Sequence, residues 1–141
     1  MKYLFIGLLF MGLFACKSTK NIAPDTFEGN QIRFGSGGGI TGAVTQWALL
    51  ENGGLWGVSG HPEASLQYVA RVSKKEVKAV FAAIDTLNWG EAPDEPGNMY
   101  RFLELREPDQ RMRMVWDPFK QENFPELNAF FDKLKVIMQD Y

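Results

Sequence analysis

The chain has 141 residues, 45% of them hydrophobic, and a formal net charge of −2. This length and composition fit one globular domain with its own core and exclude a wholly disordered chain. The charge gives no electrostatic reason to expect nucleic acid as a partner. A single cysteine and a single histidine exclude an intrachain disulfide, and a zinc site would have to consist almost entirely of carboxylates.

The first residues have the pattern of an export signal. Lys2 precedes an apolar run at residues 4–13, and the small residue Ala15 stands directly before Cys16. A charged start, an apolar stretch and a small residue at the cut are typical of a secretory signal. The run is too short to span a bilayer, which takes about 20 helical residues. We therefore predict that residues 1–15 are a cleaved signal peptide.

The Leu13-Phe14-Ala15-Cys16 stretch resembles the lipobox of bacterial lipoproteins, although Phe14 is bulkier than the usual residue. The resemblance implies cleavage before Cys16 and acylation of that cysteine with chains such as palmitate. Two or three chains hold a protein stably in a membrane. The alternative is an ordinary signal peptide with an incidental cysteine, but an unpaired cysteine is a liability in an exported protein. By the same resemblance, Lys17 in place of an aspartate favours the outer membrane over the inner one.

The polar residues that follow, 16–30, lack hydrophobic periodicity and are interpreted as the acylated cysteine and a flexible tether. Residues 31–141 then form one domain. Its first part predicts a short strand at residues 32–34, interrupted by glycines, and a strand at residues 43–51 with apolar side chains on both faces. Asn52-Gly53 predicts a hairpin turn into a returning strand at residues 55–58.

The second part of the domain predicts a helix, a hairpin and a second helix. Ser73 and Glu76 form a capping box, and apolar residues follow at helical spacing (Val77, Val80, Phe81, Ile84, Leu87). Residues 88–98 read as a loop rich in proline, glycine and acids. Residues 99–106 and 111–116 alternate in polarity and predict a hairpin with one core face and one solvated face. Asn123 with Glu126 predicts the start of the last helix, with a buried stripe (Leu127, Phe130, Phe131, Leu134, Met138).

Two amphipathic helices need an apolar surface to cover, and two hairpins supply one. We therefore predict an α+β fold: a two-layer sandwich in which an antiparallel sheet from two hairpins has both helices packed on one face.

The most unusual segment is glycine-rich, and six of its residues are candidates for binding a partner: Gly37, Gly38, Gly39, Ile40, Thr41 and Gly42. It formally satisfies a dinucleotide-binding pattern, but that pattern must open a helix, and this segment runs into a strand. The structural alternative is a bulged turn that needs positive φ angles. The functional alternative is a backbone loop that is presented to a partner.

No catalytic set emerges from the remaining candidates, and no cofactor or metal is predicted. His61 lacks a nucleophile in a recognisable context. Glu91, Asp94 and Glu95 could bind calcium, but their spacing matches no EF-hand, so a solvated acidic loop is the simpler reading. The tryptophans are interpreted as core residues, with a ligand cleft as the alternative (Trp47, Trp56, Trp89, Trp116).

Phe34-Gly35-Ser36-Gly37-Gly38-Gly39-Ile40-Thr41-Gly42, with Glu51-Asn52-Gly53, resembles a group of small uncharacterised lipoproteins from Bacteroidota. The pattern extends to Pro96-Gly97-Asn98-Met99-Tyr100 and to the strand around Trp116, and so covers nearly the whole domain. More remotely, Gly38-Gly39-Ile40-Thr41-Gly42 resembles the Gly-Gly-Phe-Ala-Gly type segment of emfourin, an inhibitor of thermolysin-like metalloproteases; Ile40 and Thr41 depart from it.

These observations favour a membrane-anchored envelope lipoprotein with a non-catalytic binding domain. Its special case is a protease inhibitor that presents the glycine-rich loop in the periplasm. The competing hypothesis is a metal- or ligand-binding protein or enzyme that uses His61 with Glu91, Asp94 or Glu95.

Overall fold

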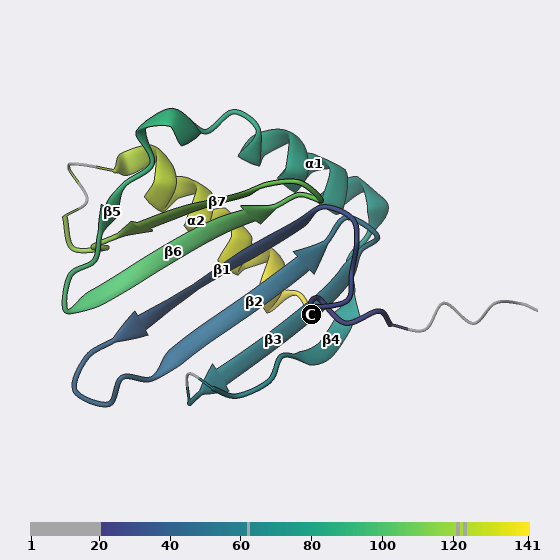
Figure 1. Ribbon diagram of the computed structural model, residues 1–141, viewed down its shortest axis with the longest axis horizontal. Coiled ribbons are helices and arrows are strands. Elements are labelled where there is room, and N and C mark those ends of the chain that lie inside the picture. The colour runs from purple at the N-terminus through teal and green to yellow at the C-terminus, as the bar shows by residue number, and fades with distance from the viewer. Residues whose placement is uncertain (1–20, 62, 121, 123) are drawn as a thin grey trace, which may run out of the picture.

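The computed structural model describes residues 21–61, 63–120, 122 and 124–141, and these form one sheet and two helices, a mixed α+β fold (Figure 1). The strands are β1 (Gln31–Gly38), β2 (Val44–Leu50), β3 (Gly54–Gly60), β4 (Gln67–Arg71), β5 (Asp94–Glu95), β6 (Met99–Arg106) and β7 (Arg111–Trp116). The helices are α1 (Lys74–Ile84) and α2 (Pro125–Gln139), with a short 3₁₀ turn at Trp89–Glu91.

The seven described strands are ordered β4-β3-β2-β1-β6-β7-β5, and every pair is antiparallel except β5 with β7. The prediction of an α+β fold with a largely antiparallel sheet is confirmed at this level. β2 pairs with β3, and β6 with β7, in antiparallel register. The sheet is nevertheless larger than two hairpins, because β1 lies between them and the unpredicted β4 and β5 form its edges.

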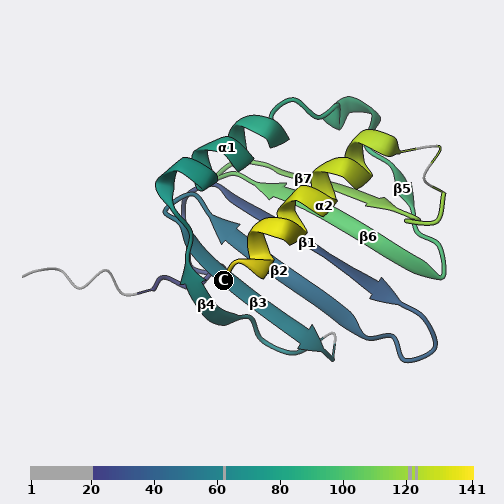
Figure 2. The same cartoon turned by 180° about the vertical axis from the view of Figure 1, so that it is seen from behind.

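Both helices lie side by side on one face of the sheet, which we call the inner face (Figures 1 and 2). An aromatic cluster joins the sheet to α2. The ring of Phe131 meets Phe34 and Trp116 edge-to-face, with centroids 6.1 and 5.9 Å apart. This edge-to-face geometry adds to the stabilisation that comes from burying the rings. Phe131 therefore lies at the centre of the core.

The glycines do not interrupt β1, contrary to the prediction of a short strand ending at Phe34. Gly35 and Gly37 lie inside the strand, beneath aromatic rings of β6. A Cβ on Gly35 would lie 2.1 Å from the Thr45 carbonyl oxygen and 2.8 Å from the Phe102 ring, and one on Gly37 would lie 2.7 Å from the Tyr100 hydroxyl. The strand continues because glycine leaves room for these rings to cover it.

Helix α1 begins as predicted, because the Ser73 hydroxyl accepts a hydrogen bond from the Glu76 N–H. The apolar stripe on α1 is buried at three positions, Val77, Val80 and Ile84. Phe81 is only half-buried and packs against the edge of this core. The reason is a pocket between α1 and the end of the sheet, into which this ring projects.

Helix α2 buries all five positions of its predicted stripe. It begins at Pro125, without a side-chain cap, because proline at the first helical position already has a helical φ and lacks an N–H that would go unpaired. The expected cap residue, Asn123, lies outside the described residues.

The outer face of the sheet is not simply solvated. Glu104, expected on a solvated face, is 1% exposed. Its carboxylate accepts hydrogen bonds from Arg111 at 2.6 Å and Arg113 at 3.0 Å, and also pairs with Arg106. The sequence pattern missed this cluster because two of the three arginines, Arg111 and Arg113, come from the neighbouring strand β7.

The N-terminal segment also differs from the prediction of a flexible tether. Pro24 is buried, and its carbonyl accepts a hydrogen bond from the Gln31 side chain at 2.8 Å. Asp25 pairs with the nearly buried Arg33 at 2.7 Å. The described part, residues 21–30, is therefore attached to the outer face of the sheet, and residues 16–20 lie outside the described residues.

The sheet has two ends that matter for function. Its entry end, where β1 begins, carries the turns at residues 51–53 and 107–110. Its far end, where β1 finishes, carries the glycine-rich turn and residues 96–98 and 117–120. At about 3.3 Å per residue, the eight residues of β1 separate the two ends by about 23 Å.

Candidate functional site

The glycine-rich segment is part strand and part turn. Gly37 and Gly38 belong to β1 and pair with Tyr100 and Met99 of β6. The turn itself is closed by backbone hydrogen bonds, from the Gly39 N–H to the Asn98 carbonyl at 2.9 Å and from the Gly42 N–H to the Gly39 carbonyl at 3.2 Å. The loop therefore has a defined backbone and is not a loose connection.

Three glycines here adopt positive φ angles: Gly38 at 104°, Gly39 at 76° and Gly42 at 60°. A Cβ on Gly38 would also lie 2.1 Å from the Asn98 carbonyl oxygen, whereas one on Gly42 would meet nothing within 4 Å. The need for a positive φ and for space beside Asn98 is thus sufficient to explain glycine at position 38. It does not explain why the apolar residue Ile40 stands between Gly39 and Gly42.

Ile40 is 106% exposed at the tip of the turn. An isolated, fully exposed branched apolar residue on an ordered turn gains nothing from folding. Two further apolar side chains are exposed at the same end of the sheet, Met99 at 37% and Phe119 at 79%. The Met99 sulfur would lie 3.2 Å from a Cβ on Gly39, which places it against the turn.

We call Ile40, Met99 and Phe119 the far-end apolar group. Sequence reasoning selected Ile40 and Thr41 only as members of the glycine-rich segment, and it missed Met99 and Phe119. A usable signal was present for Phe119, an aromatic residue in an otherwise polar and proline-containing stretch between a strand and a helix. For Met99 no such signal existed, because it reads as the first residue of β6.

The structure does not bring His61 to the acidic loop. His61 directly follows β3, whereas Asp94 and Glu95 form β5, five strand positions across the sheet. At about 4.8 Å per position this is about 24 Å. Within the residues that the structure describes, no group of three His, Cys, Asp or Glu side chains could hold a metal ion. The site proposed for His61 with these acids therefore does not form.

The acids of that loop are solvated, as the simpler reading expected. Glu91, Asp94 and Glu95 are all exposed, and Glu91 accepts a hydrogen bond from the Asn88 side chain at 3.1 Å.

The tryptophans do not line a common cleft. Trp116 is fully buried and donates to the Asn128 side chain at 3.0 Å. Trp89 donates to the Ile84 carbonyl at 3.2 Å. Trp47 covers Gly57 on the inner face, and Trp56 packs on Tyr68 at the other face, with ring centroids 5.6 Å apart. Each tryptophan ring therefore packs in a different part of the domain.

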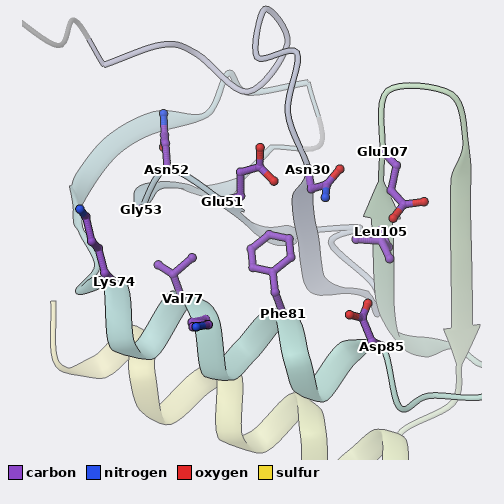
Figure 3. A pocket seen from close by; sticks show the side chains of 11 residues that line it. Asn30, Glu51, Asn52, Gly53, Lys74, Val77, Phe81, Asp85, Leu105 and Glu107 are labelled. Atoms are coloured by element: carbon purple, nitrogen blue, oxygen red, sulfur yellow. The ribbon is translucent and has the colours of Figure 1, made fainter.

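A concave site lies instead at the entry end, between α1 and the sheet (Figure 3). Its volume is about 410 Å³, within the range of small-molecule sites. Phe81 points into it from α1, while Lys74 and Asp85 lie toward opposite sides and Glu51 lies across from the helix (Figure 3). Sequence reasoning missed this pocket, since its walls come from residues 30, 51–53, 105 and 107 as well as from α1.

Cys16 lies outside the described residues, so the predicted anchor stays a prediction. Neither of the helices in the described part of the chain is long and apolar enough to cross a membrane. A scan against protein-family models finds no match, and a search of curated proteins finds no similar sequence.

Proposed function

We propose that the chain is a protein of the cell envelope that is anchored in the outer membrane by acylation of Cys16. Its domain binds a protein partner without catalysis. In this proposal the domain is a two-layer α+β sandwich whose two hairpins carry its turns. The observation that supports it most is the fully exposed Ile40 on an ordered turn. The turn lies about 23 Å along β1 from the point where the N-terminal segment enters the sheet.

This geometry suits presentation from a membrane. Eight Cα–Cα steps separate Cys16 from the buried Pro24, and they span at most about 28 Å when extended. The entry end therefore lies within about 28 Å of the anchor, and the far-end apolar group lies about 23 Å farther along β1. A partner would meet Ile40 first and Met99 and Phe119 beside it.

Replacing Cys16 with serine tests the anchor. We expect the wild-type chain to fractionate with membranes and the Cys16→Ser variant to appear in the soluble fraction, because the acyl chains supply the membrane affinity. Far-UV circular dichroism should be the same for both, since the anchor lies outside the packed domain. A serine variant that stayed with membranes would contradict the lipid anchor.

Replacing Ile40 with aspartate tests the binding turn. The full-length chain serves as bait in an envelope extract, and recovered proteins are identified by mass spectrometry. We expect one stoichiometric partner with the wild-type chain and at least about a tenfold loss with Ile40→Asp, the effect of a charge in an apolar contact. The melting temperature of Ile40→Asp should equal that of the wild type, because the Ile40 side chain is fully exposed.

The matched control is Val136→Asp, an exposed apolar position of α2 at 59% exposure. This variant should recover the partner as well as the wild type does. Valine at Gly38 is unsuitable as a test of binding, since its positive φ and the close Asn98 carbonyl would strain the fold. Equal recovery of the partner by Ile40→Asp and by the wild type would contradict the proposal.

The second candidate is the inhibitor of a thermolysin-like metalloprotease that the resemblance to emfourin implies. Its support is the ordered turn with one protruding apolar side chain, because a preorganised loop binds at a lower entropic cost. To test it, the chain is added to thermolysin and the rate of hydrolysis of a peptide substrate is measured. Inhibition that Ile40→Asp removes would favour this candidate, and full protease activity at saturating chain would exclude it for that enzyme.

A further inference from the structure

The pocket at the entry end has an apolar floor. Val77 and Leu105 are buried at its base, and Phe81 is half-buried with part of its ring open to the cavity (Figure 3). An aromatic face that is left open in a concave site can still lose water to a ligand. The cavity therefore offers apolar contact as well as charge.

Four of the lining residues form one stripe along α1. Lys74, Lys78, Phe81 and Asp85 follow one another at spacings of four, three and four residues, which places them on one side of a helix. The stripe reads cation, cation, aromatic, anion. Glu51 and Glu107 add carboxylates from the sheet side of the pocket.

These charges are arranged against the dipole of their own helix. Lysines near the first turn of α1 and an aspartate at its C-terminal cap each have the sign that the helix dipole disfavours. None of Lys74, Lys78, Asp85 or Glu51 takes part in an ion pair with another described residue. These exposed charges therefore have no ion-pair partner in the described part of the chain, and a ligand with two opposite charges could supply one at each end.

The spacing indicates the size of that ligand. Seven residues of helix separate Lys78 from Asp85, which corresponds to about 10 Å at 1.5 Å per residue. An extended tripeptide spans about 10 Å at 3.3–3.6 Å per residue. Its terminal carboxylate and terminal ammonium are therefore about as far apart as Lys78 and Asp85 along the helix axis.

We propose that this pocket binds a short peptide of about three residues with free ends. The terminal carboxylate lies at Lys78 and Lys74, and the terminal ammonium lies at Asp85 with Glu107 nearby. An apolar central side chain packs on Phe81. This site is at the opposite end of the sheet from Ile40, so it stands independently of the proposed partner binding.

Calorimetric titration of the full-length chain, in a neutral detergent, with alanyl-leucyl-alanine tests the proposal. We expect saturable binding that weakens with added salt, because exposed charges are screened. Acetylating the amino end or amidating the carboxyl end of the tripeptide should each weaken binding about tenfold or more, the effect of losing a charge-assisted hydrogen bond. No heat of binding at millimolar tripeptide, or equal binding of the blocked peptides, would overturn it.

Lys78→Gln and Asp85→Asn should each weaken binding of the free tripeptide about tenfold and leave the melting temperature within a few degrees of wild type. Lys78→Gln should bind the free and the amidated tripeptide equally well, while still binding the acetylated one more weakly. Asp85→Asn should bind the free and the acetylated tripeptide equally well, while still binding the amidated one more weakly. The control is Lys135→Gln, an exposed lysine on α2 away from the pocket. Variants that bind like the wild type would place the ligand elsewhere and contradict the assignment.

Discussion

Replacing Phe131 with alanine is expected to lower the free energy of unfolding by about 3–5 kcal/mol, the range for removing a buried aromatic ring. Phe131 is 3% exposed and contacts both Phe34 and Trp116 edge-to-face. The guanidinium carbon of Arg101 lies 4.7 Å from its ring centroid. The loss would therefore include cavity formation and two aromatic contacts that join α2 to the sheet. Urea unfolding, followed by tryptophan fluorescence, measures it.

Two other phenylalanines provide matched controls. Phe119→Ala should change stability by less than about 0.5 kcal/mol, because its side chain is exposed. Phe81→Ala should fall between the two, because its ring is half-buried and opens into the pocket. A loss below about 1 kcal/mol for Phe131→Ala would mean that α2 does not pack on the sheet as described.

Replacing Glu104 with glutamine is expected to cost about 3 kcal/mol, near the lower end for breaking a buried ion pair. The carboxylate is buried, but its partners Arg111 and Arg113 reach solvent and can be rehydrated when it is lost. Glutamine keeps the shape of the side chain while removing its charge, so the change reports mainly on the ion pairs. Chemical denaturation near neutral pH measures the effect.

The same residue gives stability a pH dependence. Burial opposes ionisation of Glu104, but hydrogen bonds from Arg106, Arg111 and Arg113 outweigh it and hold the pKa of this carboxyl below its ordinary value of 4.5. A carboxyl whose pKa is lower in the folded state stabilises the fold fully above its unfolded pKa. That contribution is lost as the pH falls through the lower, folded pKa.

We therefore expect the free energy of unfolding of the wild-type chain to fall as the pH drops below the ordinary carboxyl pKa of 4.5, and to fall less steeply in Glu104→Gln. Some slope should remain, because the hydrogen bond from Arg33 also lowers the pKa of Asp25. The exposed Glu95→Gln serves as the control and should keep the wild-type slope. Identical slopes for Glu104→Gln and the wild type would show that this cluster does not carry the effect.

The candidate binding turn was partly predictable. The run of glycines marked residues 37–42 as unusual, and positive φ angles do occur there. The sequence could not show which structural requirement each glycine meets. Gly35 makes room for the Thr45 carbonyl of β2 and the Phe102 ring, and Gly37 for the Tyr100 ring, whereas Gly38 needs its own positive φ and the close approach of Asn98. That division depends on which strand lies beside β1, and no local pattern contains it.

The sequence by itself determined the elements whose signals are local. The cap at Ser73, the stripe of α2 and the strands at Met99–Arg106 and Arg111–Trp116 follow from hydrogen bonding and periodicity within a few residues. Only the tertiary structure decided what arises between distant segments: β1 at the centre of the sheet, the burial of Glu104, and the pocket beside Phe81. The physical reason is that burial and ion pairing depend on neighbours in space, which strand order sets and sequence spacing does not.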